Sequence, residues 1–306
     1  MIKTLRILIF CDKIQAAYNA KVPFRQDLII ICAGKGGGME IIMKTFAIGF
    51  AERNPSRDVF MLHSHDNYEI LYFLAGDSEY VVEGAVYPLC PHDMILIRPQ
   101  EMHRIYHKSD ALYSRLVISI EKSFFEQEEC MPYRSVFLDR RSGTRNRICA
   151  AAVSKSGIGE LFERMKKYTD GYKNLTSPVI RGEIIELLHL LNSVNLSDSP
   201  RTNSIQEIIA YINGNYQNPI SLSSIAEEFY ISREHLSRLF KKSTGYTLSG
   251  YVNHKRIIAV GEGYRQGATL GDACICAGFN DYTAFYRAIR REYGISPREW
   301  FSGLSV

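Results

Sequence analysis

The chain has 306 residues, 46% of them hydrophobic, which is long for one typical domain and enough for two buried cores. A net charge of +4 is too small to indicate a nucleic-acid partner by itself, so any such prediction depends on where the charges lie. Seven scattered cysteines without a CxxC pair argue against a disulfide framework or zinc ribbon, and no apolar run reaches the roughly 18 residues of a membrane span, which together favour the reducing cytoplasm and no membrane partner.

The amino-terminal extension, residues 1–44, contains the run Lys35-Gly36-Gly37-Gly38-Met39. Its codons readily include a purine-rich ribosome-binding sequence just ahead of an ATG, which predicts a translation start at Met39 or Met43 and a leader over residues 1–38. A flexible glycine linker after a short amino-terminal segment explains the same residues equally well. Mass spectrometry of the natively expressed protein distinguishes the two, because a peptide from residues 1–34 excludes the later start.

Short runs of β-type residues separated by turn signals follow between Thr45 and Ser119. Glu83-Gly84 lies between two such runs and predicts a tight hairpin turn. Several short antiparallel strands without long helices are typical of a barrel or sandwich, so we expect a small β-barrel over residues 45–140.

A cluster of potential ligands accompanies these strands. On a strand His63 and His65 point to the same side, and Glu69 returns to it after a turn-prone Asp-Asn pair. With His103, the set suits a divalent transition metal such as zinc, nickel, manganese or iron, or alternatively a hydrogen-bonded pocket floor without an ion. Some strand tyrosines, Tyr72 and Tyr80 among them, could stack on a sugar-like ligand, although most such tyrosines serve packing.

The spacing of these residues resembles two motifs of the cupin superfamily. His63-x-His65-x3-Glu69-x6-Gly76 is similar to the first motif and Pro99-x3-His103 to the second. The resemblance implies a β-barrel in which the two histidines, Glu69 and His103 are the metal ligands. Two positions depart from the pattern, because Arg57 and Glu101 stand where glycines are usual.

Amphipathic stretches over residues 141–203 predict a helical bridge. In the second amphipathic stretch, which begins at Ser177, apolar residues recur at helical spacing, namely Ile184, Leu187, Leu188 and Leu191. Such helices either pack on the barrel or pair between two subunits, so we expect dimerisation as one role of this segment. The run from Ser193 to Ser204, rich in Ser, Asn and Pro, is typical of an interdomain linker.

The region from residue 204 to residue 306 begins with a capping box, Ser204-x-x-Glu207, and a helix. The next stretch predicts a helix-turn-helix unit, with small Ala226 where the helices cross, a break at Tyr230-Ile231 and Ser232 as helix cap. The second helix leaves a charged and polar face outward that suits a DNA major groove, with nearby lysines meeting phosphates. This outward set is Arg233, Glu234, Ser237, Arg238, Lys241 and Lys242.

The same pattern then recurs. Cys274 occupies the crossing position, Gly278 the turn, and Asp281 the start of the second helix. Three arginines of this helix, Arg287, Arg290 and Arg291, are predicted to face outward. One solvated basic helix would be an ordinary finding, but two repeats with matching core and turn positions favour DNA binding.

Two such units joined by a long helix, here around Ser249 to Gln266, resemble the AraC/XylS family of bacterial transcription regulators. The matching signature is Gly278-Phe279, Asp281, Phe285, Gly294 and Pro297. The resemblance implies base contacts from Glu234, Ser237, Arg238, Tyr282, Thr283, Tyr286 and Arg287. It also implies an amino-terminal cupin-like sensor, a small-molecule effector, a homodimer, and double-stranded DNA and RNA polymerase as partners.

The chain departs from this family pattern at Cys274, Ile289 and Phe301, and in the connecting helix at Gly261 and Gly263. Each interior glycine costs roughly 1 kcal/mol of helix stability relative to alanine, which predicts a softer coupling between the two units.

The sequence therefore predicts an α+β multidomain protein: a cupin-like barrel, a helical bridge and an all-α tandem helix-turn-helix domain. The leading hypothesis is a non-enzymatic, ligand-responsive regulator of carbohydrate uptake or catabolism genes, its sugar class supported only by the resemblance and the barrel aromatics. One alternative is a metal-dependent cupin enzyme fused to a DNA-binding domain, and another a constitutive DNA-binding protein whose barrel only dimerises. Activator and repressor roles both stay open.

Overall fold

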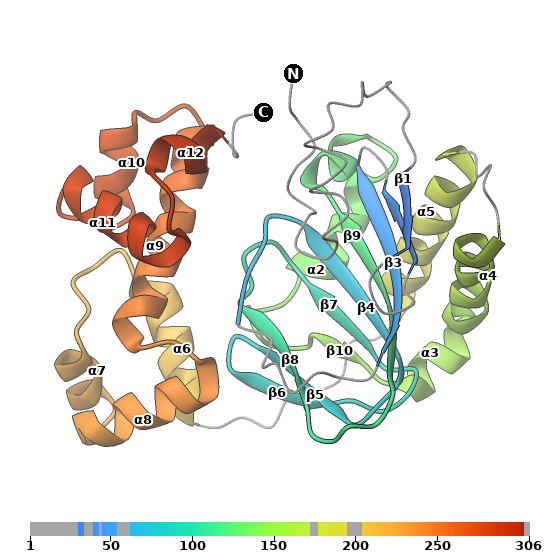
Figure 1. Ribbon diagram of the computed structural model, residues 1–306, viewed down its shortest axis with the longest axis horizontal. Coiled ribbons are helices and arrows are strands. Elements are labelled where there is room, and N and C mark those ends of the chain that lie inside the picture. The colour runs from blue at the N-terminus through green and yellow to red at the C-terminus, as the bar shows by residue number, and fades with distance from the viewer. Residues whose placement is uncertain are drawn as a thin grey trace. The chain divides into compact units, whose positions relative to one another are not determined.

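A computed structural model of the chain describes residues 30–33, 39–42, 45–53, 62–171, 177–194 and 204–302. These residues form two compact units, one up to Val194 and one from Ser204 onward (Figure 1). The first is rich in β-sheet and the second is all helical, so the predicted α+β multidomain fold class is confirmed. Most of residues 1–44, and the glycine run before Met39, lie outside the described residues, so the predicted translation start stays a prediction.

Two antiparallel sheets form the first unit. The seven-stranded sheet has the order β1-β2-β3-β9-β4-β7-β10 and the three-stranded sheet the order β6-β5-β8. Their strands are β1 (Ile30–Ala33), β2 (Met39–Ile42), β3 (Phe46–Arg53), β4 (Tyr68–Ala75), β5 (Ser78–Val82), β6 (Ala85–Pro88), β7 (Met94–Ile97), β8 (His103–His107), β9 (Tyr113–Ile120) and β10 (Arg147–Ile148).

The hairpin between β5 and β6 has the predicted two-residue turn. Glu83 has φ +47° and Gly84 has φ +77°, the left-handed pair that a tight hairpin with right-handed strand twist requires. This turn pairs Val82 with Ala85. The local sequence therefore fixes the register between β5 and β6.

Alternate residues of β4 enter two different cores. Tyr68, Ile70 and Tyr72 face the helices that cover the larger sheet, whereas Leu71 and Phe73 face the smaller sheet. Because side chains alternate along a strand, Glu69 points to the side of Leu71 and Phe73, between the two sheets. This alternation decides which polar residues can meet in one site.

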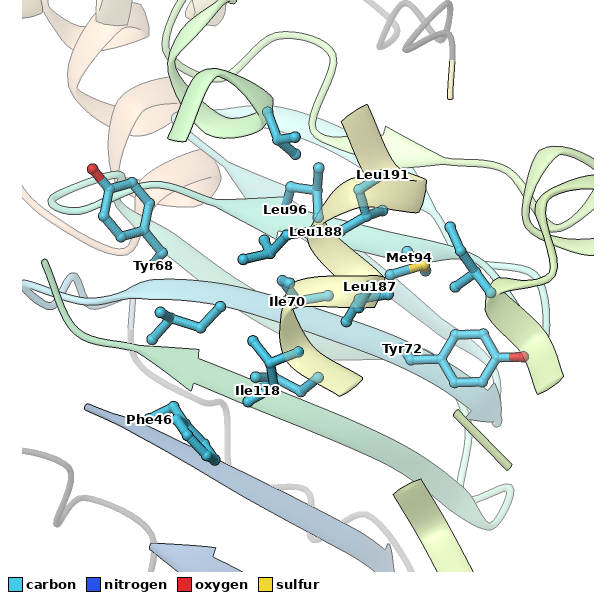
Figure 2. Close-up of a cluster of buried hydrophobic side chains, with 14 of the residues drawn as sticks. Phe46, Tyr68, Ile70, Tyr72, Met94, Leu96, Ile118, Leu187, Leu188 and Leu191 are labelled. Carbon is cyan, nitrogen blue, oxygen red and sulfur yellow. The ribbon is translucent and has the colours of Figure 1, made fainter. Parts of the chain in front are cut away.

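Helices cover the outer face of the larger sheet (Figure 1). They are η2 (Lys122–Glu126), η3 (Met131–Arg134), α2 (Ser135–Leu138), α3 (Ala150–Ser156), α4 (Ile158–Gly171) and α5 (Ser177–Ser193). Figure 2 shows Leu187, Leu188 and Leu191 of α5 packed against the sheet residues Ile70 and Leu96. The predicted bridge helices therefore pack on the strands of their own unit. Burial of each such side chain contributes about 1.5–3 kcal/mol to the stability of this packing.

The second unit contains seven helices among the described residues 204–302. They are α6 (Ser204–Asn215), α7 (Leu222–Glu228), α8 (Arg233–Thr244), α9 (Leu248–Arg265), α10 (Leu270–Cys276), α11 (Tyr282–Tyr293) and α12 (Pro297–Ser302). The long α9 matches the connecting helix predicted around Ser249 to Gln266. Two helix pairs, α7 with α8 and α10 with α11, are the predicted helix-turn-helix repeats.

None of the helices in the described part of the chain is long and apolar enough to cross a membrane.

Candidate ligand-binding and nucleic-acid-binding sites

The predicted ligand cluster lies between the two sheets. Glu69 is the second residue of β4 and His103 is the first residue of β8. Residues 62–67, the described part of the segment before β4, do not form a strand, contrary to the expectation for His63 and His65. Instead, His63 and His103 exchange two backbone hydrogen bonds of 3.1 and 2.8 Å, and Gln100 N–H donates to the carbonyl of His65 at 2.8 Å. These bonds place the segment beside β8.

Three of the four predicted ligands converge. The donor atoms of His65, Glu69 and His103 lie within 4.8 Å of one another, with His65 Nε2 at 3.0 Å from Glu69 Oε2. Tyr80 joins them by donating its hydroxyl proton to Glu69 Oε1 at 3.1 Å, and its ring stacks on the His103 ring at a centroid distance of 6.0 Å. His63 is not part of the converging set, although its ring centroid lies 4.4 Å from that of His103.

Backbone carbonyls orient both histidines of this set. Nδ1 of His65 lies 3.0 Å from the carbonyl oxygen of Asn67, and Nδ1 of His103 lies 2.8 Å from that of Glu101. A proton on each Nδ1 satisfies these carbonyls and directs both Nε2 atoms at the cluster. Nε2 of His65 donates to Glu69 when that ring carries its second proton, whereas Nε2 of His103 stays an acceptor. Nε2 of His103 is buried, has no hydrogen-bond partner among the described residues, and can accept a hydrogen bond or bind a metal ion.

The charges of the cluster follow from its burial. Burial alone would lower the pKa of His65, but the hydrogen bond and charge of Glu69 raise it. Burial alone would raise the pKa of Glu69, but the hydrogen bond and charge of His65 and the charge of Arg115 hold it well below the ordinary range. Burial lowers the pKa of His103 to about 3, so its imidazole is neutral. An anionic oxygen and a neutral nitrogen therefore face one another.

This donor set fits a divalent transition metal. Two imidazole nitrogens and one carboxylate oxygen are ligands that zinc, nickel, manganese and iron accept. The carbonyls behind both rings supply the outer hydrogen bonds that metal-bound histidines ordinarily have. His65, Glu69 and His103 would hold such an ion, and the ion would supply a positive centre that binds a ligand oxygen.

A buried ion pair holds the backbone that orients His103. The carboxylate of Glu101 accepts from both terminal nitrogens of Arg140 at 2.7 Å, and also from the N–H of Gly143 at 2.9 Å. Burial alone would raise the pKa of Glu101, but the charge and hydrogen bonds of Arg140 lower it. Glu101 stands where the cupin pattern has glycine, and the structure explains this departure, because its side chain anchors the backbone whose carbonyl orients His103.

The predicted DNA-reading helices have the same construction. Both α8 and α11 are 12 residues long. The hydroxyl of Ser232 accepts from the N–H of His235 at 3.2 Å, and the carboxylate of Asp281 accepts from that of Ala284 at 2.7 Å. Gly245 and Gly294 end the two helices with φ of +80° and +72°. These matching caps confirm the internal repeat.

The outward faces also agree with prediction. The apolar side chains Leu236 and Phe240 of α8, and Phe285 and Ile289 of α11, are fully buried. All the residues predicted to contact DNA are exposed, namely Arg233, Glu234, Ser237, Arg238, Lys241, Lys242, Tyr282, Thr283, Tyr286, Arg287 and Arg290. Arg290 donates to the carbonyl of Gly294 at 3.2 Å, so part of its guanidinium serves its own helix end.

Comparison with known protein families identifies both units. A sequence model of the AraC-like ligand binding domain matches residues 47–173, and one of the helix-turn-helix domain matches residues 225–303, which together exceed half of the chain. The chain belongs to the AraC family of transcription regulators. It is similar to the HTH-type transcriptional activators RhaR and RhaS of Escherichia coli O139:H28, with 22% identity over 259 residues and 24% over 262 residues. Each match covers 83% of this chain and 91% of the relative.

Among solved structures, ToxT from Vibrio cholerae is 12% identical, with a TM-score of 0.36, over 86% of this chain and 100% of that one. The AraC-family matches place the protein among DNA-binding regulators with a ligand-binding domain. They give no support to the alternative of a metal-dependent enzyme, and the predicted non-enzymatic role stands.

One predicted ligand-binding residue of this AraC-family regulator lies elsewhere. Tyr72 is on the helix side of β4, stacked on Phe162 at 4.3 Å, with its hydroxyl 2.7 Å from Nδ1 of His92. Burial, with the charges of Glu163 and Glu160, raises the pKa of this tyrosine to about 12. Tyr72 and Glu69 are three residues apart on a strand and point to opposite faces, so Tyr72 does not face the cluster that Tyr80 joins.

Tyr72 instead lines a separate hollow of about 740 Å³ between β4 and the helices α3 and α4.

Sequence reasoning missed Arg115 of β9. Its neighbours at even spacing, Tyr113 and Val117, belong to the core between the sheets, so Arg115 points to the same side as Glu69. Its guanidinium lies 6.0 Å from the ring of Tyr113, and its charge contributes to the low pKa of Glu69. The available signal was one arginine at an alternating position of an apolar run.

Proposed function

We propose that this AraC-family regulator reads double-stranded DNA with the exposed faces of α8 and α11, under the control of a small molecule bound between the two sheets. One observation carries the DNA part: two 12-residue helices with the same caps expose the predicted base-contacting residues while their apolar residues are buried. Each capped amino end offers N–H groups to phosphates, and the arginines reach base edges in the major groove.

The effector that best suits the cluster is a sugar or sugar derivative. Glu69 and Nε2 of His103 are acceptors for hydroxyl groups, and the Tyr80 ring offers an aromatic face beside them. Several acceptors around one aromatic ring suit a ligand with many hydroxyls. Control of carbohydrate uptake or catabolism genes follows from such an effector.

A second candidate for the same cluster is metal-assisted binding, in which an ion held by His65, Glu69 and His103 binds the effector. It is favoured by Nε2 of His103, which has no hydrogen-bond partner in the described part of the chain, and by the carbonyls that orient both rings.

The assembly we propose is a cytoplasmic homodimer that works with RNA polymerase. Family resemblance supports dimerisation and the polymerase contact, and the free thiols of the described cysteines agree with a reducing compartment. The names of RhaR and RhaS favour activation of transcription.

DNA binding is tested by selecting operator sequences from a random duplex library with the purified full chain. Arg238→Ala and Arg287→Ala should each weaken binding to the selected duplex by about 1–3 kcal/mol and relax its sequence preference. Lys242→Ala should weaken binding more uniformly across sequences. Arg298→Ala, an equal loss of charge on the exposed part of α12, is the matched control. Wild-type affinity and specificity in both recognition-helix variants would refute the assignment.

Effector binding is tested by a thermal-shift screen of the full chain against neutral sugars, sugar acids and phosphorylated sugars. Tyr80→Phe should weaken a hit by about 0.5–1.5 kcal/mol, because the variant lacks the hydroxyl that donates to Glu69. Tyr106→Phe, on the exposed β8 residue, should leave the affinity unchanged. Equal affinities in the two variants would move the effector away from this cluster.

A further inference from the structure

The long helix α9 is held on one side by a shared carboxylate. His254 is 4% exposed, and its Nδ1 lies 3.0 Å from Oε1 of Glu292, near the end of α11. Tyr246, in the loop between α8 and α9, donates its hydroxyl proton to the same Oε1 at 3.0 Å. This contact, which we call the Glu292 clamp, joins the end of the first recognition helix, the connecting helix and the second recognition helix.

On another side α9 is held through Arg256. Its Nε donates to the carbonyl of Tyr216 at 2.7 Å and its Nη2 to that of Asn218 at 2.8 Å, both in the loop between α6 and α7. Its guanidinium carbon lies 6.0 Å from the ring centroid of Phe279, in the turn of the second helix-turn-helix unit. We call this contact the Arg256 clamp, and it joins the beginning of the first helix-turn-helix unit to the turn of the second.

The backbone closes the Arg256 clamp. A Cβ on Gly278 would lie 2.4 Å from the carbonyl oxygen of Gln217. The turn of the second helix-turn-helix unit therefore packs directly on the loop between α6 and α7, to which Arg256 donates its hydrogen bonds. Two residues apart on a helix differ by about 200° around its axis, so His254 and Arg256 point to nearly opposite sides of α9. The two clamps therefore contact the connecting helix on opposite sides, and we expect them to restrict both bending and rotation between the two helix-turn-helix units.

The carboxylate shared by the Glu292 clamp is charged. Burial alone would raise the pKa of Glu292, but the hydrogen bonds of His254 and Tyr246 lower it, so the carboxylate is ionised near neutral pH. Hydrogen bonds to an ionised partner are stronger than neutral ones and have narrower geometry. None of the clamp residues is among those predicted to contact DNA.

We propose that the Glu292 and Arg256 clamps fix the separation and relative rotation of α8 and α11, so that the protein selects operators by the spacing between two contacted segments. The inference depends on the proposed use of both helices in DNA binding. Glu292 and Arg256 are then positioning residues, which act on specificity without touching a base. A rigid link gives the second helix a high effective concentration at one spacing and a very low one at others, whereas a flexible link levels this difference.

The test uses the full chain and a duplex selected from a random library, with the two contacted segments located by footprinting. Duplexes with one or two base pairs inserted or deleted between the segments, and duplexes holding one segment alone, are then measured. Two added base pairs turn the second segment by about 70° and move it by about 7 Å. Wild-type affinity should fall at least about tenfold on such duplexes.

Glu292→Ala and Arg256→Ala should bind the selected duplex several-fold more weakly, yet lose less than about threefold when the spacing changes, with affinity for single segments unchanged. Glu228→Ala and Arg298→Ala remove the same charges at exposed positions and should keep the wild-type spacing profile. Emission of Trp300 and the melting temperature establish folding. Should an alanine variant fail to fold, Tyr246→Phe and Arg256→Lys, which keep the side-chain bulk, take its place.

A wild-type spacing profile in the folded clamp variants would overturn the inference, as would an equal loss of affinity at every spacing and on single segments. Failure of the wild-type chain to select any duplex would instead refute the proposed function. A wild-type chain that selects a duplex but tolerates all spacings equally would refute the rigid coupling and leave DNA binding standing.

Discussion

Gly278 offers a quantitative test of how the two helix-turn-helix units fit together. It has φ +93°, and a Cβ added there would lie 2.4 Å from the oxygen and 2.8 Å from the carbon of the Gln217 carbonyl. Gly294 has a similar backbone, with φ +72°, but an added Cβ would meet none of the described atoms within 4 Å. The pair Gly278→Ala and Gly294→Ala therefore shares the cost of a left-handed alanine and differs in the collision with Gln217.

The expected magnitudes follow from these two terms. A left-handed alanine costs about 1–2 kcal/mol, which is the whole expected effect of Gly294→Ala. Overlap with backbone atoms adds about 1–3 kcal/mol, because Gln217 cannot swing aside as a flexible side chain could. We expect Gly278→Ala to lower the free energy of unfolding of the second unit by about 2–5 kcal/mol.

The assay is urea unfolding of the full chain followed by tryptophan emission. Trp300 is the single tryptophan of the sequence and lies in α12, with its ring centroid 5.0 Å from that of Phe301, so its emission reports on the second unit alone. Equal losses of stability in Gly278→Ala and Gly294→Ala, within about 0.5 kcal/mol, would refute the close packing of the turn on Gln217.

Three further predictions test other contacts. Gly214→Ala should raise the stability of the second unit by about 0.5–1 kcal/mol, because no described atom lies within 4 Å of the new Cβ. Gly263→Ala should give no such gain, because its Cβ would lie 3.3 Å from the Cβ of Ala273 in α10. Equal gains of the two variants in unfolding followed by Trp300 emission would contradict this prediction. Arg140→Ala should lower the stability of the first unit by about 3–5 kcal/mol in calorimetry, because a buried carboxylate loses its cation, while exposed Arg141→Ala should cost under about 0.5 kcal/mol. Added Zn²⁺ or Ni²⁺ should raise the melting temperature of the first unit in the wild type and leave that of His103→Ala unchanged, and a rise in both would place the ion elsewhere.

Features set by near neighbours in sequence could be predicted. The caps Ser232 and Asp281, the outward faces of α8 and α11 and the two-residue hairpin turn each depend on residues within a few positions. Hydrophobic spacing of 3.6 or 2 residues determines which face is buried, whatever the distant partner. This explains why the all-helical domain was predicted in detail.

Features set by distant pairing could be predicted only in part. Period-2 alternation places Tyr72 on the opposite face from Glu69, but assigning a face to the ligand requires knowing which face the helices cover. His65 joins the ligand cluster although its segment is no strand, because backbone bonds to β8 hold it there. Arg140 pairs with Glu101 across 39 residues, and no local pattern indicates that partner.

The glycines of α9 require a different explanation from the one the sequence favoured. Helix propensity alone predicts that Gly261 and Gly263 soften the coupling between the two units. In the structure Gly261 is buried, and Gly263 lies where a Cβ would press on Ala273 at 3.3 Å, so close approach of α10 to α9 is a sufficient reason for a small residue.

The residues of α9 that take part in the Glu292 and Arg256 clamps, His254 and Arg256, precede these glycines by about one to two turns. The two clamps therefore connect α9 to both helix-turn-helix units without involving the glycines. Soft coupling therefore requires these polar contacts to be weak, and that can be measured. If Gly261→Ala with Gly263→Ala changes neither thermal stability nor the spacing profile of DNA binding, whereas the Arg256 and Glu292 variants change the profile, the coupling resides in the side chains that grip α9 and not in the flexibility of its backbone.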